Sequence, residues 1–516
     1  MATTFESSAE GRSVLDAEPG DEDRRPSVAF PVNWRPGPVQ VAILALCAVM
    51  GYVDARPVSD LDSYWHVAIG RQMTDWLQVF RRGAAGYGTD WLAVPAPEWS
   101  SSEWLSERGM AALVDTWGWR ALVVAKVLTL LAVLVTLAAV LLQRHQRFIA
   151  AGVWLIVAAC ITPLAEDRPQ TLSMLFLVLL AWVCVRTWDA RRPPPLIAVG
   201  LGCLLWAQLH GMWLMAPLAL GATTVGLALD ALWHRTPQNR RLAVRTGLAA
   251  VVSLAGLVNP LGLSSLLLPL RFRDAGSVIS EWHPTTLYLP HTIAWVAVIV
   301  LAVAGWVIGP RPCLAELVYV ATWGVFGATT LRNALLALLL LAPVPVAALH
   351  RSIGARWEHN VRPSHGREHR FLVAATALAS VVAVVAPLVE VSRIDPLQQT
   401  EVMPIGQALS TRSAPVRVFN DYNASGQLVA FGGGKVRLVV DGRFDMWGKA
   451  GVDRIGDVEQ LRGDWRGALR DLKVSAIVVS SGTPLALQLQ REGTWHITTF
   501  HRQWVLLEPT GTTATP

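Results

Sequence analysis

The chain has 516 residues, of which 53% are hydrophobic and only 16% charged, whereas soluble proteins carry about a quarter charged residues. This composition excludes an ordinary soluble globular protein and indicates a polytopic membrane protein with some soluble parts. The net charge of +6 does not indicate nucleic-acid binding, because the arginines cluster in short loops between apolar runs. The five cysteines lie in or beside apolar runs, which supports neither a disulfide framework nor a cysteine metal site.

The first segment, residues 1–36, is acidic, contains serine, proline and glycine, and shows no apolar periodicity. Such a segment cannot bury enough apolar surface to fold, so we expect a disordered tail. It does not have the basic start and apolar core that mark a secretory signal peptide.

Eleven apolar runs that are long enough to cross a membrane, or nearly so, follow this tail. In chain order the runs are 38–54, 119–142, 147–164, 170–187, 195–209, 212–230, 243–260, 291–309, 313–329, 331–349 and 371–389. We therefore predict a mainly α-helical, polytopic membrane bundle of about eleven spans over residues 37–389.

The charges of the loops orient these spans. If the N-terminus is cytoplasmic, every loop on the inner side contains arginine, whereas the long outer loop at 55–118 has more acids than arginines. This asymmetry satisfies the positive-inside rule. We therefore expect a multi-pass protein of the plasma membrane, with the tail at 1–36 in the cytoplasm and residues 55–118 and 390–516 outside.

The outer loop begins with a predicted juxtamembrane helix. Apolar positions recur at helical spacing over 61–80, which predicts an amphipathic helix lying in the headgroup plane of the bilayer. Asp62 and His66 are four residues apart and share its polar face. Asp60 would make a good N-cap for this helix, so one interpretation of the acids is purely structural.

A second interpretation gives the same acids a chemical role. Asp60 and Asp62 together are more than an N-cap requires. A carboxylate at the membrane surface can deprotonate an acceptor hydroxyl, or hold a divalent cation against a phosphate. Arg168 and Arg332, in other outer turns, are suited to hold the phosphate of a lipid leaving group.

Tryptophans are unusually frequent in the outer loop. An interfacial aromatic belt explains most of them. Trp65 and Trp104 lie nearest the acids in the sequence, and we expect these two to be candidates for stacking against sugar rings.

Polar residues also occupy the outer turns, beside the membrane. They are Glu103 in the first loop and Arg168, Gln170, His210, Asn259, Glu281 and Arg332 in later turns. Ionisable groups at this depth usually face a cavity or a partner, because exposure to lipid is costly. We therefore predict a substrate-binding polar cavity that opens to the outside, with scattered helix caps and interfacial anchors as the alternative.

Residues 390–516 differ in character from the bundle. Predicted strands at 416–421, 436–442 and 475–481 alternate with helices after Ser425, at 458–472 and at 484–491, and a hairpin at 495–509 ends the series. This order predicts a small extracytoplasmic α/β domain. The stretch "FGGGK" within it has neither the spacing of a phosphate-binding loop nor a following Ser or Thr, so we expect a turn.

The aspartate pair at the outer end of the first span, followed by a juxtamembrane helix, resembles the GT-C superfamily of integral-membrane glycosyltransferases. A closer resemblance, to a bacterial multi-pass group of GT-C-like proteins, covers roughly residues 40–510. It rests on "DLDSYWHVAIGRQM", "EWSSSEWLSE", "EDRPQTLSMLF", "WAQLHGMWL", "VNPLGLSSLLLPL", "ISEWHP", "LRNALLALLLLAP" and, in the last domain, "VFNDYNASGQLV" and "VVDGRFDMWG".

The resemblance implies transfer of a hexosyl or pentosyl group from a polyprenyl-phosphate sugar to a glycan, lipid or protein of the cell envelope. It implies that Asp60 or Asp62 acts as the catalytic base or as a carboxylate that holds a metal, with His66 beside them. Some GT-C enzymes need a divalent cation and others do not, so the metal stays unknown.

Four residues of the last domain are additional candidates for contact with the sugar or the acceptor. They are Asp421 and Tyr422 in "NDYNASG" and Asp441 and Arg443 in "DGRFDMW". Strand ends and Asp-Gly turns explain the two aspartates equally well in structural terms.

Two other functions compete with glycosyl transfer. A transporter or flippase of lipid-linked glycans usually has charges near the middle of the membrane and inverted repeats, whereas the interiors of these predicted spans are nearly free of charge. A non-catalytic scaffold would keep the fold and bind a glycolipid or an envelope partner.

Overall fold

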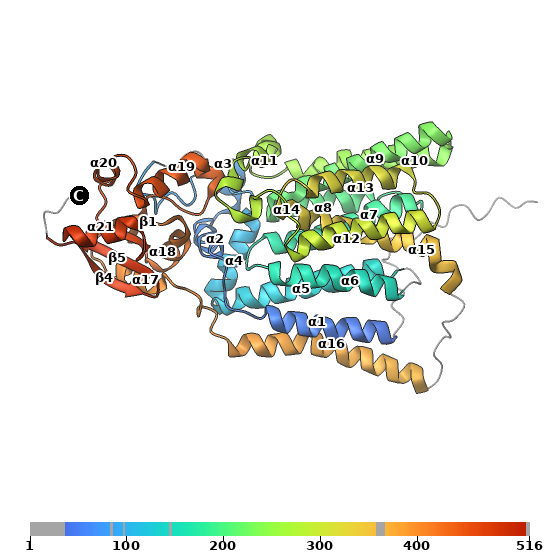
Figure 1. Ribbon diagram of the computed structural model, residues 1–516, viewed down its shortest axis with the longest axis horizontal. Coiled ribbons are helices and arrows are strands. Elements are labelled where there is room, and N and C mark those ends of the chain that lie inside the picture. Colours follow the sequence, from blue (N-terminus) through green and yellow to red (C-terminus); the bar gives the residue numbers. More distant parts are fainter. Residues whose placement is uncertain (1–36, 83–85, 96–98, 144–146, 358–366, 512–516) are drawn as a thin grey trace, which may run out of the picture. The chain divides into compact units, whose positions relative to one another are not determined.

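A computed structural model of the chain describes residues 37–82, 86–95, 99–143, 147–357 and 367–511. The tail predicted at 1–36 lies outside these residues. The described chain forms a bundle of long helices followed by a small domain built on a β-sheet (Figure 1). The expected class, mainly α-helical with a small C-terminal α/β domain, is therefore confirmed.

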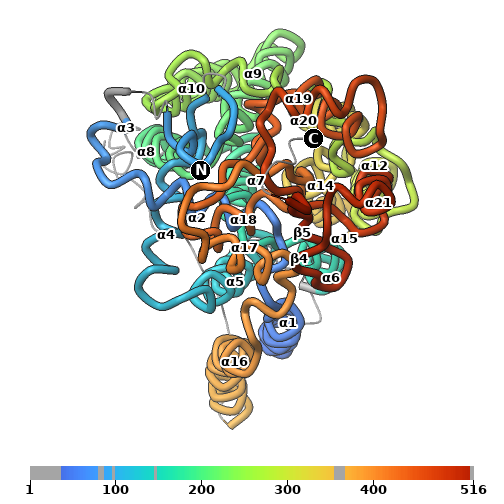
Figure 2. The backbone as a smooth tube through the Cα atoms, turned by 90° about the vertical axis from the view of Figure 1, so that its left-hand side faces the viewer, coloured from blue at the N-terminus to red at the C-terminus, as the bar shows by residue number. Residues whose placement is uncertain are grey.

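Every predicted apolar run coincides at least in part with a helix of the bundle. The helices are α1 (Pro38–Asp54), α5 (Arg120–Leu141), α6 (Arg147–Ile161), α7 (Gln170–Asp189), α8 (Leu196–Leu209), α9 (Met215–His234), α10 (Pro237–Ser253), α12 (Pro290–Ile308), α13 (Leu314–Gly327), α14 (Leu331–Leu341), α15 (Pro343–Trp357) and α16 (Arg367–Arg393). Figure 2 shows α16 at the margin of the bundle, beside α1.

Six helices in the described part of the chain are long and apolar enough to cross a membrane. A further helix pair, Pro237–Leu257 with Gly262–Ser277, qualifies only as a unit bent by 110°, and four apolar helices are shorter. Length and composition therefore support six crossings, or seven with the bent pair. The expected eleven crossings stay a prediction.

Three helices follow α1 in the first loop: α2 (Asp62–Gln72), α3 (Trp76–Arg82) and α4 (Trp104–Trp117). The prediction of one continuous interfacial helix is wrong in two respects. The helix breaks after α2, because the Asp75 carboxylate accepts the backbone N–H of Leu77 at 2.9 Å and so starts a new helix. In addition, α2 does not lie along a surface but is largely buried, packed against α4 and against α18 of the last domain.

The last domain contains one five-stranded sheet in the order β2-β1-β3-β5-β4. The strands β1 (Val416–Asn420), β2 (Val436–Leu438) and β3 (Ala476–Ser480) are parallel, and β5 (Trp504–Pro509) and β4 (Trp495–His501) form an antiparallel hairpin at the edge. The helices are α17 (Met403–Ser410), α18 (Ser425–Phe431), α19 (Phe444–Glu459), α20 (Trp465–Asp471) and α21 (Pro484–Glu492).

The helix predicted at 458–472 is in fact two helices. The first, α19, starts at Phe444 and ends at Glu459. The second, α20, begins at Trp465, where the Asp464 carboxylate accepts the N–H of Gly467 at 2.8 Å. The apolar periodicity is continuous through this break and so predicts one helix. The N-cap residue Asp464, which lies within the break, indicates where the second helix starts.

The hydrophobic core of the last domain includes the first loop. Trp65 and Ile69 of α2 belong to one buried cluster with Val418 of β1 and Leu438 of β2. Leu92 of the first loop also forms a parallel bridge with Leu438 at the edge of the sheet. The loop that follows the first helix and the domain that ends the chain therefore fold as one layer on the end of the bundle.

Candidate functional site

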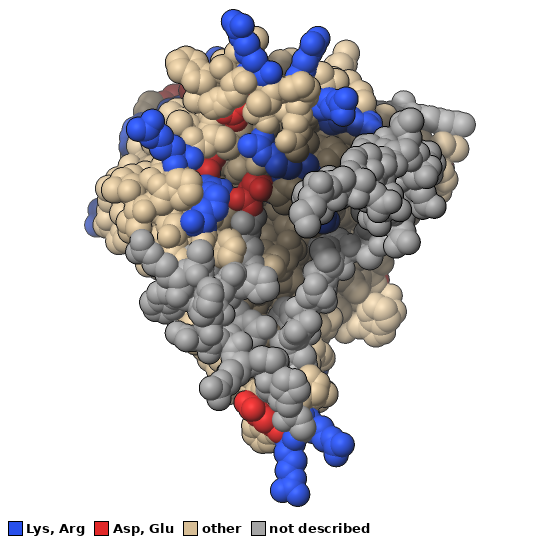
Figure 3. Space-filling view, turned by 90° about the vertical axis from the view of Figure 1, so that its right-hand side faces the viewer, with Lys and Arg blue, Asp and Glu red and all other residues tan. Residues whose placement is uncertain are grey.

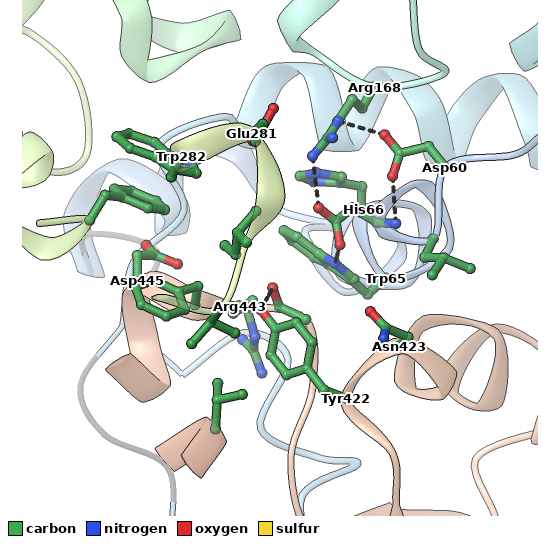
Figure 4. A pocket seen from close by; sticks show the side chains of 18 of the residues that line it. Asp60, Trp65, His66, Arg168, Glu281, Trp282, Tyr422, Asn423, Arg443 and Asp445 are labelled. Atoms are coloured by element: carbon green, nitrogen blue, oxygen red, sulfur yellow. Dashed lines mark hydrogen bonds and ion pairs between the residues drawn. The ribbon is translucent and has the colours of Figure 1, made fainter. Parts of the chain in front are cut away.

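A cavity of about 690 Å³ lies between the bundle and the last domain. Its walls come from α2 and the residues before it, from α4 and the loop before it, from the turns that precede α7 and α9, from the segment 272–282 before α12, from the first turn of α14 and from the last domain. Segments far apart in the sequence therefore supply one polar chamber (Figure 4).

Asp60 and Asp62 converge on one guanidinium in this cavity. Arg168 Nε lies 2.5 Å from Asp60 Oδ2, and Arg168 Nη1 donates to Asp62 Oδ2 at 2.9 Å (Figure 4). The same Nε lies 2.7 Å from a Glu166 oxygen. The second oxygen of Asp62 accepts the indole N–H of Trp65 at 3.0 Å. One cation therefore holds three carboxylates at the start of α2.

The backbone fixes this arrangement locally. Asp60 Oδ1 accepts the N–H of Asp62 at 2.9 Å, so Asp60 does cap the helix as well as face the cavity. The turn that carries Arg168 is tied to α2 by Ser63, whose hydroxyl donates to the Asp167 carbonyl at 2.8 Å. Behind the turn, Lys126 lies 3.4 Å from the Asp167 carboxylate. The structural and the chemical interpretations of Asp60 are therefore compatible.

The pKa of Asp60 is far from its usual value. Burial, together with the charges of Asp62 and Glu166, raises the pKa of Asp60 to about 7 against the opposing charge of Arg168. Glu103 behaves similarly, because burial raises its pKa to about 7 while His66 lowers it. Carboxylates that titrate near neutral pH are suited to proton transfer.

A second group of ionisable side chains lies beside the aspartates. Glu103 Oε1 is 3.2 Å from Nε2 of His210, and Glu103 Oε2 is 3.8 Å from Nε2 of His66. Nδ1 of His66 lies 3.1 Å from Oε1 of Glu107, and Nδ1 of His210 accepts the N–H of Met212 at 3.3 Å. The two imidazoles therefore face one shared carboxylate.

The wall contributed by the bundle ends in a second ion pair. Arg332 Nη1 donates to Glu281 Oε1 at 2.6 Å, and the Arg332 guanidinium lies 5.3 Å from the ring centre of Trp282. Although burial opposes ionisation, Arg332 and Arg168 lower the pKa of Glu281. Arg168, from the turn before α7, and Arg332, from the first turn of α14, thus reach the same cavity.

The last domain supplies the opposite wall. Tyr422 donates its hydroxyl to the Gly442 carbonyl at 2.6 Å, and Asp421 accepts the N–H of Asn423 at 2.7 Å. Arg443 is almost fully buried, and its Nη2 lies 2.5 Å from Oδ2 of Asp441. Only an edge of that pair reaches the cavity, because Arg443 lines it and Asp441 does not.

Most of the predicted site residues line this one cavity. They are Asp60, Asp62, Trp65, His66, Glu103, Arg168, Gln170, His210, Glu281, Arg332, Asp421, Tyr422 and Arg443. Trp104, Asn259 and Asp441 do not line it. A polar cavity lined by most of these residues is therefore present, whereas its opening to the outside and its use as a substrate site stay predictions.

The three outlying residues have structural contacts instead. Trp104 Nε1 donates to the side-chain oxygen of Gln208 at 3.0 Å. Asn259 Oδ1 accepts the N–H of Leu261 at 2.8 Å and so holds the turn at which the bent helix pair changes direction. Asp441 accepts from Trp91 and Trp447 as well as from Arg443.

Sequence reasoning missed four acids that line the cavity, namely Glu107, Glu166, Asp445 and Glu459. Burial raises the pKa of Asp445 to about 6 and that of Glu459 to about 8. The available signal for Glu107 was its place one helical turn after Glu103 in "SEWLSE". No sequence signal indicates Glu459, because the helix predicted at 458–472 puts this residue at a helix start, whereas it is the last residue of α19.

The possible divalent cation finds no ready site. No group of three or more His, Cys, Asp or Glu among the described residues is arranged to hold a metal ion. The carboxylates that gather at the start of α2 surround the guanidinium of Arg168, which fills the place of a cation between them.

No protein-family model and no curated protein matches the chain. Among solved structures it is similar to ArnT from Cupriavidus metallidurans in the apo state, with 15% identity over 92% of this chain and 98% of that chain and a TM-score of 0.49. It is also similar to the oligosaccharyltransferase of Archaeoglobus fulgidus in complex with zinc and sulfate, with 11% identity over 86% of this chain and 68% of that chain and a TM-score of 0.45.

Proposed function

We propose that this membrane protein transfers a hexosyl or pentosyl group from a polyprenyl-phosphate-linked donor to a glycan, lipid or protein of the cell envelope. One observation carries the proposal. The cavity combines carboxylates that titrate near neutral pH with two arginines, at the end of an apolar bundle. A base for a hydroxyl group and cations for a phosphate are the two requirements of such a transfer.

In this reaction Asp60 or Asp62 takes the proton of the acceptor hydroxyl as its oxygen attacks the anomeric carbon of the donor. Arg168 and Arg332 hold the lipid phosphate, which leaves with the electrons of the broken bond. Guanidinium groups suit this task because they stay charged and bind phosphate oxygens in pairs. Arg168 contacts both aspartates, so a phosphate bound to this arginine would lie close to the base, with the sugar beside both.

The polar walls also suit a sugar. Among the described residues, Glu107 Oε2, Gln170 Oε1 and Glu459 Oε1 are buried acceptor atoms without a hydrogen-bond partner, and all three residues line the cavity. Buried acceptors of this kind are rarely left unsatisfied. The hydroxyl groups of a sugar would supply the missing donors, with Trp65 and Tyr422 as neighbouring ring surfaces.

We further propose that the cavity opens on the extracytoplasmic side. Figure 3 views the end of the bundle away from the sheet domain, where Lys and Arg outnumber Asp and Glu. The positive-inside rule assigns such an end to the cytoplasm. The lipid bilayer would then surround the bundle, with the last domain in the envelope space.

Asparagine substitutions of the two aspartates test the proposal. We expect Asp60→Asn and Asp62→Asn, singly and together, to abolish restoration of the envelope glycan in a strain that has lost this protein. Expression and thermal stability in detergent should stay close to wild type, which must be checked for each variant. The matched control is Asp471→Asn in α20 of the last domain, outside the cavity lining.

Full restoration by the double variant would contradict a catalytic role of the aspartates. A scaffold would tolerate both substitutions and respond instead to deletion of residues 390–516. A transporter would move a lipid-linked glycan without changing its covalent structure.

A further inference from the structure

His66 and Glu107 form a buried pair whose geometry the proposed reaction has not yet used. Glu107 is 1% exposed and His66 is 4% exposed. Their contact, 3.1 Å between Oε1 and Nδ1, places the proton on Nδ1, because a carboxylate only accepts. The other ring nitrogen, Nε2, lies on the cavity side, 3.8 Å from Glu103, which is longer than a hydrogen bond.

The backbone holds this pair in register. The helices α2 and α4 approach so closely at Gly70 that a Cβ there would meet the carbonyl oxygen of Glu107 at 2.0 Å. His66 is one helical turn before Gly70, so the same contact sets the distance from the ring to Glu107. A buried carboxylate on Nδ1 that leaves Nε2 facing the reactants is the way enzymes orient a histidine for proton transfer.

The charged groups around His66 come from several elements. Asp62 lies on its own helix, and Glu103 and Glu107 face it from α4 and the residue before that helix. The third neighbouring element, α18, has no titratable side chain, because its sequence is "SGQLVAF". His210, Arg168 and Arg332 complete the set, since the charges of His66 and both arginines act on His210.

These surroundings shift the pKa values of the two imidazoles in opposite directions. Burial opposes a charge on His66, but the hydrogen bond with Glu107 and the charges of Glu103, Glu107 and Asp62 prevail and raise its pKa. Burial, together with Arg332, His66 and Arg168, lowers the pKa of His210 well below its usual value. The surroundings therefore favour the protonated form of His66 and the neutral form of His210, which is how acid and base assignments separate in a site.

We propose that His66 is the general acid of the transfer, giving its Nε2 proton to the phosphate that leaves the donor, and that Glu107 is the residue that positions its ring. This inference rests on the proposed function, because it assigns a residue to one step of that reaction.

The acceptor oxygen bonds to the anomeric carbon and its proton passes to Asp60 or Asp62. The bond from that carbon to the phosphate oxygen breaks, and its electron pair stays on the phosphate. The Nε2 proton of His66 then neutralises one charge of the departing phosphate. The aspartic acid and the neutral histidine return to their first states by exchange of one proton with water.

A short prenyl phosphate tests the dyad without knowledge of the sugar. The full chain in lipid nanodiscs is titrated with geranyl phosphate between about pH 7 and pH 9, a range above the second ionisation of a phosphate monoester at about pH 6. We expect wild-type affinity to fall as the pH rises through the raised pKa of His66. His66→Gln should bind about tenfold more weakly or worse at the low end of the range, the usual value of a hydrogen bond between charged groups, and should lose the fall.

Glu107→Gln separates positioning from packing. The amide keeps an acceptor for Nδ1 but removes the charge, so the fall in affinity should move to lower pH while the folded protein persists. Glu107→Asp, which restores the charge, should bring the fall back toward the wild-type pH. His496→Gln and Glu492→Gln, both exposed in the last domain, are the matched controls and should leave the profile unchanged.

Four results would overturn the inference. A fall in affinity that is the same in wild type and His66→Gln would assign the pH dependence to Glu103 or Asp60, whose pKa values are both about 7. A profile that Glu107→Gln does not move would remove the positioning role. If wild type does not bind geranyl phosphate at all, the proposed function fails with it, whereas binding that Arg168→Gln abolishes and His66→Gln spares leaves the proposed function standing and removes the dyad alone.

Discussion

At the scale of single residues, the chemistry of the cavity depends on how Asp60 is surrounded. Its carboxyl caps a helix through one oxygen and contacts Arg168 through the other. Burial and the negative charges of Asp62 and Glu166 nevertheless raise its pKa to about 7. A carboxylate with this pKa is ionised in a large fraction of the molecules at neutral pH, and it is a stronger base than an ordinary aspartate.

Glu166 gives this account a pH test. Because the Glu166 carboxylate raises the pKa of Asp60, Glu166→Gln should lower it. If Asp60 is the base of the proposed transfer, the rate in wild type should fall as the pH drops below about 7, and the same fall should begin at a lower pH in the variant. The measurement is the initial rate of transfer against pH, with Glu492→Gln as the control. An acid limb that stays in place or moves to higher pH would contradict the role of Asp60.

At the scale of elements, α2 connects the fold to the site. It carries Asp62 and His66, and α4 and α18 pack closely against this region of the chain at two glycines. A Cβ at Gly70 would meet the Glu107 carbonyl of α4 at 2.0 Å, and a Cβ at Gly426 of α18 would meet the Leu61 carbonyl at 2.4 Å. Such contacts leave no room for a side chain, so they fix the position of the helix that presents the reactive groups.

Alanine at these glycines should therefore loosen the site. We expect Gly70→Ala to destabilise the protein by about 1–3 kcal/mol, the usual cost of overpacking, and to reduce transfer further than the loss of folded protein explains. Gly109→Ala in α4 is the matched control, because a Cβ there has no neighbour within 4 Å. The readouts are the midpoint of thermal unfolding in detergent and the rate per folded molecule. Equal stability of the two variants would contradict the account.

Which elements the sequence could predict follows from how local their causes are. The apolar runs and the alternation of strands and helices after Val416 depend on nearby residues. Each run coincides at least in part with a helix, and the alternation is present apart from the break that divides the helix predicted at 458–472. The burial of α2 depends on contacts with α4 and α18, which are distant in the sequence. Periodicity alone cannot show these partners, so it indicates that the apolar stripe faces lipid. The same applies to the clamp in which Arg443 donates to the carbonyl of Gly88, 355 residues earlier in the chain.

At the scale of the whole molecule, the cavity exists only because the first loop, the turns of the bundle and the last domain meet. In the proposed reaction a lipid-linked donor and an envelope acceptor must reach the same end of the bundle, so the proposal requires a particular membrane orientation. The opposite end of the bundle is rich in Lys and Arg (Figure 3), which supports the proposed placement of the cavity on the extracytoplasmic side.

Thiol labelling tests the orientation. The native cysteines are buried or half-buried, so an impermeant maleimide should react weakly with wild type. In intact cells we expect strong labelling of Arg491→Cys, which is exposed in the last domain, and none of Arg241→Cys, which is exposed near the start of α10. Both should react after the cells are opened. The reverse pattern would place the cavity on the cytoplasmic side and exclude an envelope acceptor.

The most direct test of the central claim compares the lipids and envelope glycans of a deletion strain with those of its parent. If the chain transfers a sugar from a lipid phosphate, the deletion strain accumulates one polyprenyl-phosphate sugar and its envelope glycan lacks that same sugar, and the wild-type gene reverses both changes while the Asp60→Asn, Asp62→Asn double variant does not. Unchanged polyprenyl-phosphate sugars together with an intact glycan in the deletion strain would contradict the claim.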